Sequence, residues 1–307
     1  MAGALRRLVA RGLALRPLLA PVAPWGWRRR ARWTARGGAV GHHAPRGHAV
    51  CDLEACPQLE PALEAVLGAV RAAGALRGDG VVHAAVGAGA HVVLDAPCDP
   101  ARARALVGRA GIAGVTWRAP GGEAGHAGAP AIELEPGLQA RGDDFAQASR
   151  AGNDALRAVV AEAVAPVRRG LRVLELHAGS GNFTRDLVAA GAAVTASDGR
   201  APLAPPAGLA GELLLGDDAA VVGRLAAAGA RFDLVLLDPP RAGARAAVAA
   251  LPALGPDRVV YVSCDPSTLA RDGELLAAAG LAPRWAQALD LMPQTAHVEV
   301  VACFERQ

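Results

Sequence analysis

The sequence has 307 residues, a charged fraction of 20% and a formal net charge of +3, which fits a soluble protein with one large or two medium domains. All 32 basic residues are arginine, and no apolar run approaches the roughly 18–20 residues of a membrane-spanning helix. None of the five cysteines belongs to a C-x-x-C pair, which argues against a disulfide framework and against a cysteine-ligated zinc or iron–sulfur site. We therefore expect a cytoplasmic protein without metal or membrane contact.

Positive charge is concentrated at the start of the chain. Residues 1–50 contain ten arginines and no acidic residue, whereas the other 22 arginines are outnumbered by the 29 acidic residues. This asymmetry favours a basic surface for an anionic partner, with nucleic acid as the first candidate. A solvated face and a targeting segment are the alternatives, and the scarcity of Ser and Thr weakens the second.

The first 140 residues predict a small α+β domain. A short helix is expected at 4–13, and apolar residues at helical spacing predict another at 59–74. Strands are expected at 81–86, 91–96 and 112–118, with a short helix at 100–109. The boundary of this domain is placed after residue 140.

Helices and strands alternate in residues 141–307. Nearly continuous apolar runs predict strands at 171–176, 193–198, 232–238 and 258–263, as in a parallel sheet covered on both faces. Two strand-like runs, 284–291 and 297–304, follow without an intervening helix, which indicates a terminal antiparallel hairpin. The fold class is therefore α/β, with a Rossmann-like, mostly parallel sheet behind the smaller domain.

Ligands of such sheets bind at the carboxyl ends of the strands, and the first two strands end in a nucleoside-binding pattern. The turn H-A-G-S-G-N (177–182) has Gly179 and Gly181, but Thr184 stands where a dinucleotide motif has its third glycine. Asp198 is placed to hold a ribose, and Asp217 to contact an adenine amino group. Together these features resemble a class I S-adenosylmethionine methyltransferase; an ordinary Rossmann-like domain with surface acids is the alternative.

The next strand ends supply a carboxylate, a thiol and a second carboxylate, namely Asp238 in D-P-P, Cys264 and, on the terminal hairpin, Glu299. A thiolate that adds to C6 of uracil makes C5 nucleophilic enough to accept a methyl group. A base must then remove the C5 proton so that the thiol can leave. Two other interpretations stay open: Cys264 as a core residue, and methylation of an amino group through D-P-P.

Five ordered motifs in residues 145–307 resemble the RNA uridine-C5 methyltransferases that modify tRNA and ribosomal RNA. A weaker resemblance to the RNA-contacting central region of that family runs through residues 28–63. The motifs are F-A-Q-A-S (145–149), L-E-L-H-A-G-S-G-N-F (174–183), D-P-P-R-A-G (238–243), Y-V-S-C-D-P-S-T-L-A-R-D (261–272) and M-P-Q-T-A-H-V-E-V-V (292–301).

By this resemblance Cys264 is the nucleophile and Glu299 the base. The resemblance places the residues of the cofactor and base pocket at Gln147, His177, Asn182, Asp198, Asp217 and Asp238. Three positions depart from the family pattern: His177 replaces an aromatic ring, Ser149 an Asn and Asp265 an Asn. The chain also lacks the oligonucleotide-binding barrel and the four-cysteine motif of many relatives.

The sequence therefore predicts a monomeric methyltransferase that uses S-adenosylmethionine to methylate C5 of a uridine in tRNA or rRNA through a covalent Cys264 adduct. The alternatives are an amino-methyltransferase and an RNA-binding protein with a vestigial pocket.

Overall fold

The computed structural model describes residues 1–307 except 45, 119–123, 203–205, 207 and 211–212. The chain forms two compact units: Met1–Val22 with Ala151–Gln307, and Ala23–Arg150. The sequence-based boundary after residue 140 differs from this division mainly at the N-terminus, because the first 22 residues pack with the C-terminal half. The RNA-contacting and catalytic roles assigned to the two parts remain predictions.

The first unit is built on an eight-stranded sheet within the described residues, with the order β1-β16-β17-β15-β14-β11-β12-β13. Strands β11 to β15 are parallel, and β17 runs antiparallel between β15 and β16. The elements are α1 (Ala2–Ala10), β1 (Ala14–Leu15), α4 (Arg150–Val164), β11 (Arg172–Leu176), α5 (Thr184–Ala189), β12 (Ala193–Asp198), β13 (Leu213–Leu215), α6 (Asp218–Ala227), β14 (Leu234–Leu237), α7 (Arg245–Ala250), a 3₁₀ turn (Leu251–Leu254), β15 (Arg258–Ser263), α8 (Pro266–Ala278), β16 (Leu281–Leu289) and β17 (Glu299–Arg306). The predicted Rossmann-like sheet with its terminal hairpin is thus confirmed.

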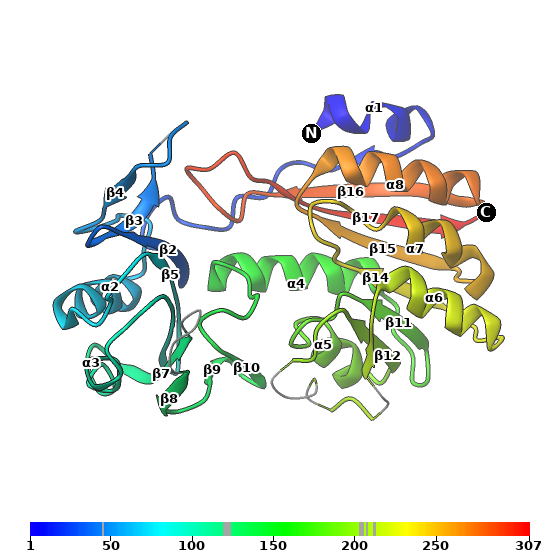
Figure 1. The fold of residues 1–307 in the computed structure, drawn as a ribbon. Helices are drawn as coiled ribbons and strands as arrows, with labels where there is room; N and C mark the ends of the chain where they lie inside the picture. Colours follow the sequence, from blue (N-terminus) through cyan, green and yellow to red (C-terminus); the bar gives the residue numbers. More distant parts are fainter. Residues whose placement is uncertain (45, 119–123, 203–205, 207, 211–212) are drawn as a thin grey trace. The chain divides into compact units, whose positions relative to one another are not determined.

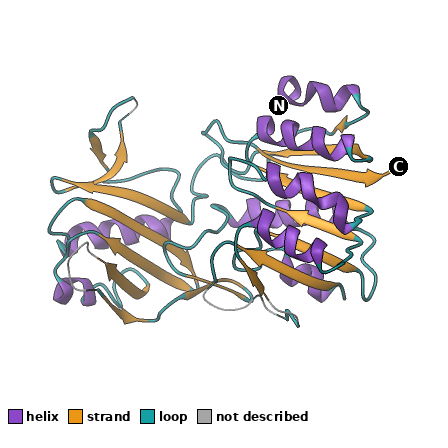
Figure 2. Ribbon diagram, turned by 45° about the vertical axis from the view of Figure 1, so that its right-hand side comes forward, coloured by secondary structure: helices purple, strands orange, loops and turns teal. Residues whose placement is uncertain are grey.

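Helices cover both faces of this sheet (Figures 1 and 2). Alternate residues of β11 enter different cores: Leu174 packs with α1, α6, α7 and α8, whereas Val173 packs with α4 and α5. Because both faces are buried, the strands need apolar residues at every position, which explains their continuous apolar runs.

The second unit contains a seven-stranded sheet among the described residues, with the order β4-β3-β2-β5-β6-β7-β8. All neighbouring strands are antiparallel except β6 and β7, which α3 connects as a parallel pair. The elements are β2 (Arg30–Arg36), β3 (Ala39–His43), β4 (Val50–Asp52), α2 (Pro61–Ala73), β5 (Gly80–Gly87), β6 (Gly89–Asp95), α3 (Pro100–Arg104), β7 (Ile112–Arg118), β8 (Gly125–Gly128), β9 (Ile132–Glu135) and β10 (Leu138–Ala140). This is the predicted α+β unit.

One face of this second sheet carries the core. Trp33, Val82 and Trp117 from the strands pack with Leu63 and Leu67 of α2. A smaller cluster on β9 and β10 includes Ala85 of β5. The second face is therefore covered only in part by apolar contacts of the described residues.

Candidate active site

The predicted catalytic residues lie at one edge of the sheet of the first unit. Parallel pairing aligns the carboxyl ends of β11, β14 and β15, and Asp238 directly follows β14. The antiparallel register of β15 and β17 pairs Ser263 with Val300. Cys264 follows Ser263 directly after β15, and Glu299 precedes Val300 as the first residue of β17. The antiparallel pairing therefore brings the thiol and the carboxyl to the same edge of the sheet.

Cys264 stands between the last residue of β15 and the start of α8. Asp265 caps that helix, since its carboxylate accepts the backbone N–H groups of Ser267 at 2.7 Å and Thr268 at 3.3 Å. Pro266 follows at the first helical position, where its lack of an N–H costs nothing. The cap explains why D-P follows the cysteine: it ends the strand at once and leaves Cys264 half-buried at the sheet edge.

The charges around Cys264 show that these groups act on one another. Burial raises the pKa of the Cys264 thiol; the Glu299 and Asp238 carboxylates raise it further, and Arg241 opposes them. Burial and Asp238 raise the pKa of Glu299 to about 8, again against Arg241. Burial raises the pKa of Asp238 to about 7. A thiol and two carboxyls therefore lie in one poorly solvated environment, and the exposed Arg241 guanidinium acts on it electrostatically.

Arg241 is a site residue that the sequence analysis did not single out. It follows D-P-P directly, and its Nη2 donates to the His297 ring at 3.0 Å. His297 precedes β17 by two residues, so this contact joins the turn after β14 to the hairpin that carries Glu299. The position of Arg241 directly after D-P-P could have marked it as a site residue, but the sequence alone did not show that it contacts His297.

The glycine-rich turn after β11 has the backbone shape expected of a cofactor loop. Gly179 and Gly181 adopt φ values of +56° and +90°, and a Cβ on Gly179 would meet no atom within 4 Å. The Gly179 N–H donates to Asp198 Oδ2 at 2.8 Å, and the Arg200 N–H donates to Oδ1 at 2.9 Å. Asp198, which the sequence predicts to bind a ribose, thus also stabilises the turn through these hydrogen bonds. Its contact with a ribose stays a prediction.

Asn182 and His177 flank this turn and have partners of their own. The Asn182 side chain exchanges two hydrogen bonds with Asn153 of α4, at 2.8 and 2.9 Å. His177 has a φ of +59°, and its Nε2 lies 3.1 Å from Asp218 Oδ2. Asp217 caps α6 through the Ala220 N–H at 3.1 Å. Asp218, which the sequence analysis did not choose, is therefore the acid beside His177.

Glu175 is a second residue that the sequence analysis missed. It is 1% exposed on β11, and the Thr184 hydroxyl donates to its Oε2 at 2.6 Å. Its Oε1 is buried without a hydrogen-bond partner among the described residues, and burial raises its pKa to about 8. Buried polar atoms are normally satisfied, so this orphaned oxygen beside an open glycine turn fits a site that holds a polar ligand.

Gln147 belongs to the other unit, and its assignment stays a prediction. Within that unit, Nε of the fully buried Arg29 donates to the Gln147 carbonyl at 3.1 Å, and Nη2 donates to Glu135 at 2.5 Å. The backbone N–H of Arg29 also donates to the Ala148 carbonyl at 2.9 Å. The backbone of F-A-Q-A-S is thus fastened to a buried ion pair, while Phe145 is 70% exposed.

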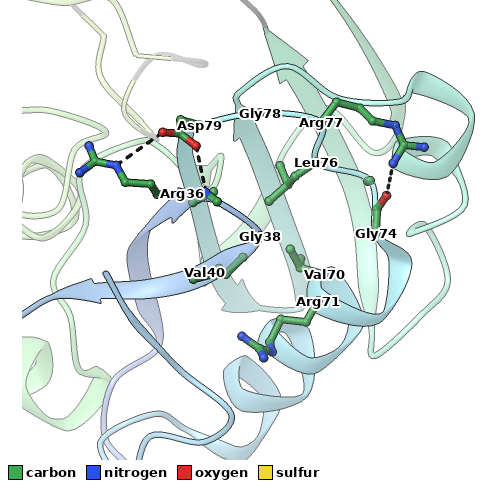
Figure 3. Close-up of a pocket in the computed structure, with 14 residues that line it drawn as sticks. Arg36, Gly38, Val40, Val70, Arg71, Gly74, Leu76, Arg77, Gly78 and Asp79 are labelled. Carbon is green, nitrogen blue, oxygen red and sulfur yellow. Dashed lines mark hydrogen bonds and ion pairs between the residues drawn. The ribbon is translucent and has the colours of Figure 1, made fainter. Parts of the chain in front are cut away.

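A cavity of about 640 Å³ in the second unit contains none of the predicted site residues (Figure 3). Its three arginines are bound to carboxylates: Arg36 to Asp79, Arg71 to Asp52 and Arg77 to Asp99. It offers no thiol and no buried acid, so we assign no reaction to it. In the described part of the chain, no helix is long and apolar enough to cross a membrane, and no three His, Cys, Asp or Glu side chains are grouped as metal ligands.

Comparison with known proteins identifies the family of the chain. The family model of the tRNA (uracil-5-)-methyltransferases matches residues 225–307, which include Asp238, Cys264 and Glu299. The 23S rRNA (uracil(1939)-C(5))-methyltransferase RlmD of Alkalilimnicola ehrlichii is 36% identical over 94% of this chain and 73% of that protein. The RlmD of Edwardsiella ictaluri is 33% identical over 98% of this chain and 75% of that protein.

The chain belongs to the RNA (uracil-C5)-methyltransferase family. It is an S-adenosylmethionine-dependent enzyme that transfers a methyl group to C5 of uracil in RNA. The fold agrees: the Pyrococcus abyssi tRNA (uracil-54, C5)-methyltransferase, solved with S-adenosyl-L-homocysteine, superposes with a TM-score of 0.72 at 19% identity, covering 98% of this chain and 81% of that one. Family membership thus confirms the predicted enzyme class, fold and cofactor of this methyltransferase.

Proposed function

We propose that the enzyme methylates uridine through a covalent adduct of Cys264, with Glu299 as the base that completes the reaction. The observation that carries this proposal is the register of β15 and β17, which brings Cys264 and Glu299 to the same sheet edge as Asp238. A nucleophile and a base that converge on one site are what C5 methylation requires.

Each group then has a defined step. The Cys264 thiolate forms a bond to C6, and the electron pair of the C5–C6 double bond moves toward C5 and the O4 carbonyl. When bound, S-adenosylmethionine supplies the methyl group that C5 accepts. Glu299 removes the C5 proton, the double bond re-forms, and the C6–S bond breaks to release the thiolate. Arg241, which lowers the pKa of both Cys264 and Glu299, stabilises their charged forms.

The residues around the glycine turn are proposed to hold the cofactor. Gly179 leaves open space for its close approach, Gly181 supplies a positive φ and lies against Pro206, and Asp198, Asn182, His177 and Asp217 surround or follow the turn. We also propose Gln147 and Asp238 as pocket residues, because they stand in the family motifs F-A-Q-A-S and D-P-P-R-A-G. Binding of S-adenosyl-L-homocysteine by an Asp198→Ala variant, measured by calorimetry, should weaken at least about tenfold if Asp198 contacts the ligand. An unchanged affinity would leave Asp198 only its hydrogen bonds from the Gly179 and Arg200 N–H groups.

RNA that contains 5-fluorouridine tests the nucleophile. Fluorine at C5 cannot be removed as a proton, so wild-type enzyme and S-adenosylmethionine should give a protein–RNA adduct that survives denaturing electrophoresis. Cys264→Ala should give none, whereas Cys51→Ala, which removes an exposed thiol, should give the wild-type amount. An adduct in Cys264→Ala, or none in a wild-type enzyme that methylates normal RNA, contradicts the assignment.

Glu299→Gln tests the base. The variant should transfer the methyl group yet stay attached to its RNA, because the C5 proton remains. Glu305→Gln, on the same strand, should turn over normally. Nucleoside mass spectrometry of RNA that the wild-type enzyme has methylated should show 5-methyluridine; a methylated exocyclic amine would instead favour amino-methylation. Binding of RNA and cofactor by the wild-type protein without methyl transfer would favour the alternative of an RNA-binding protein with a vestigial pocket.

We further propose ribosomal RNA as the substrate, with a monomeric enzyme in the cytoplasm and no bound metal or iron–sulfur cluster. Relatives of 33–36% identity over more than 90% of the chain are named for 23S rRNA. The tRNA enzyme is 19% identical. Methyl transfer to a 23S rRNA fragment and to a tRNA transcript, compared at equal concentration, should favour the fragment. Higher activity on tRNA would overturn the choice.

A further inference from the structure

Helix α8 carries a carboxylate that is fully buried. Asp272 is 0% exposed, and its Oδ2 accepts hydrogen bonds from the Tyr261 hydroxyl of β15 at 2.8 Å and from the Ala244 N–H at 2.9 Å. Its Oδ1 accepts a hydrogen bond from Nε of the neighbouring Arg271 at 2.8 Å. Ala244 is the residue directly before α7. The carboxylate therefore joins β15, α8 and the start of α7 at one point.

Stability alone does not account for this carboxylate. A buried ion pair is often no more stable than well-packed apolar side chains of similar volume, because its charges have to be removed from water. What Asp272 and Arg271 fix is the backbone of the turn between β14 and α7. Asp272 holds the end of the turn at Ala244, and Arg271 holds the residue two positions earlier, because its Nη2 donates to the Ala242 carbonyl at 2.9 Å.

The turn fits closely against these two side chains. Gly243 has a φ of +74°, in the region that favours glycine, and its N–H donates to the Pro240 carbonyl at 2.8 Å. A Cβ at this position would lie 2.5 Å from Arg271 Nη2 and 2.5 Å from Asp272 Oδ2. The glycine therefore allows the backbone of the turn to approach the guanidinium and the carboxylate.

The same turn carries two groups of the active site. Asp238 is its first residue and Arg241 lies within it, and both act on the charges of Cys264 and Glu299. Cys264 directly precedes the residue that caps α8. Helix α8 thus begins beside the thiol and, further along, holds the turn that bears the carboxyl and the guanidinium.

We propose that Arg271 and Asp272 are positioning residues for methyl transfer, which hold the turn so that Asp238 and Arg241 keep their places at the sheet edge of Cys264. The proposal rests on the proposed function for the roles of those three residues. Arg271 and Asp272 act through the backbone of the turn and do not touch the reacting atoms. A displacement of about 1 Å in a catalytic site can slow a reaction by on the order of a hundredfold, so a relaxed turn should affect the rate of transfer more than the binding of the cofactor.

Arg271→Gln tests the proposal, because the Arg271 side chain is 39% exposed and its loss should leave the fold intact. With an RNA that the wild-type enzyme methylates, kcat at saturating RNA and S-adenosylmethionine should fall by about tenfold or more. The affinity for S-adenosyl-L-homocysteine, measured by calorimetry, should change by less than about twofold. Arg271→Lys, which keeps a charged donor beside Asp272, should recover at least about a threefold part of the lost kcat.

A double-mutant cycle tests whether Arg271 acts through the turn. Arg241→Gln should lower kcat as well, and the double variant with Arg271→Gln should lose less than the product of the two single losses, because both changes affect the same group. If circular dichroism shows that Arg271→Gln is unfolded, Tyr261→Phe replaces it. That variant removes one donor to Asp272, keeps the buried ring and should lower kcat by about threefold.

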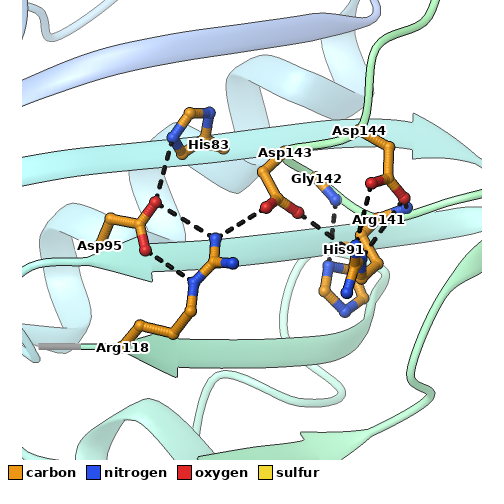
Figure 4. Close-up of polar contacts among 8 residues, drawn as sticks. All are labelled: His83, His91, Asp95, Arg118, Arg141, Gly142, Asp143 and Asp144. Atoms are coloured by element: carbon orange, nitrogen blue, oxygen red, sulfur yellow. Dashed lines mark hydrogen bonds and ion pairs between the residues drawn. The ribbon is translucent and has the colours of Figure 1, made fainter. Parts of the chain in front are cut away.

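Two control variants separate positioning from a general loss of stability. Glu274→Gln changes an acid on the same helix that is paired with Arg11 and not with the turn. Asp95→Asn changes an acid of the second unit, which accepts two hydrogen bonds from Arg118 (Figure 4). Both controls should keep the wild-type kcat.

Four results would overturn the proposal. These are a wild-type kcat in Arg271→Gln, an equal loss in Glu274→Gln, a fall in S-adenosyl-L-homocysteine affinity as large as the fall in kcat, and losses that multiply in the double variant.

The two proposals fail separately. If Arg271→Gln lowers kcat but the wild-type enzyme forms no Cys264 adduct, the positioning role stands and the covalent mechanism falls. If the adduct forms and Arg271→Gln keeps the wild-type kcat, the mechanism stands and the turn is held in place without Arg271.

Discussion

Glu175 is buried with a pKa raised to about 8, and this has a consequence for stability. A folded protein that holds a proton already lost by the unfolded carboxyl releases that proton on unfolding. The free energy of unfolding therefore falls as pH rises from roughly 5 to about 8, by up to about 1.4 kcal/mol per pH unit for each such group. Glu299 and Asp238 act in the same direction.

Glu175→Gln should remove the contribution of one titrating carboxyl to this pH dependence of stability. We expect urea unfolding of the cofactor-free protein, followed by circular dichroism, to show a shallower loss of stability between pH 6 and 8. At pH 8 the free energy of unfolding of the variant should exceed that of the wild type by about 1–3 kcal/mol. The exposed Asp154 is the control, and Asp154→Asn should leave the dependence unchanged. An identical pH slope in Glu175→Gln would show that Glu175 is ionised in the folded protein.

The Arg29–Glu135 ion pair is a buried pair of charges in the second unit, and we expect its loss to destabilise that unit. Arg29→Leu leaves the Glu135 carboxylate in the interior without its guanidinium, which should lower the free energy of unfolding by about 3–5 kcal/mol. A double variant, Arg29→Leu with Glu135→Leu, should recover at least about 1 kcal/mol, because it removes both charges. Additive losses in this cycle, measured by urea unfolding, would contradict a coupled pair.

Residues whose chemistry is distinctive were the ones predicted from the sequence. Cys264 and Glu299 stood out because uracil C5 methylation needs a thiol and a base, and the topology does bring them to one edge. Glu175, Arg241 and Arg29 were missed because their importance lies in contacts with distant residues and in burial. The choice of Asp217 over Asp218 could not be made from D-D alone, since one caps α6 and the other faces His177.

At the scale of single elements, the N-terminus of α8 fixes the geometry of the Cys264 edge. Asp265→Ala removes the cap on Ser267 and Thr268 and should lower the free energy of unfolding by about 1 kcal/mol. Asp265→Asn should cost no more than a few tenths of a kcal/mol, since Asn caps equally well. Equal losses in the two variants, measured by urea unfolding, would show that the negative charge and not the cap is what stabilises the helix.

The longer elements followed from apolar patterning, and the shortest did not. Strands β11, β12 and β15 agree with their predicted runs because burial on both faces demands apolar residues throughout. Strands β1 and β13 have only two and three residues, which is too short for any periodicity to show. They exist because β16 and β12 offer an open edge, a condition that no local sequence records.

At the scale of the whole molecule, the first unit is assembled from both ends of the chain. Leu5 and Leu8 of α1 are fully buried in the same core as Leu276 and Phe304. Strand β1 pairs with β16, with the Arg16 N–H donating to the Ala286 carbonyl at 2.9 Å. Four of the ten N-terminal arginines therefore belong to the first unit, and the sequence could not foresee this because the contacts span more than 250 residues.

Removal of residues 1–22 should therefore weaken the first unit and spare the second. The deletion exposes the surface under Leu5 and Leu8 and leaves β16 as an unpaired edge, next to the strand that carries Glu299. Leu5→Ala with Leu8→Ala, which keeps the chain length, should itself cost about 4–8 kcal/mol if the two losses add.

Hydrogen exchange measured by mass spectrometry distinguishes local from general effects in both variants. Amides of α8, β16 and β17 should exchange at least about tenfold faster, because the local free energy of opening falls. Amides of β5 and β6 should keep their wild-type protection, since they belong to the second unit. Unchanged exchange in β16 would show that the N-terminal segment adds no stability to this sheet, and faster exchange in β5 would show that the two units do not unfold independently.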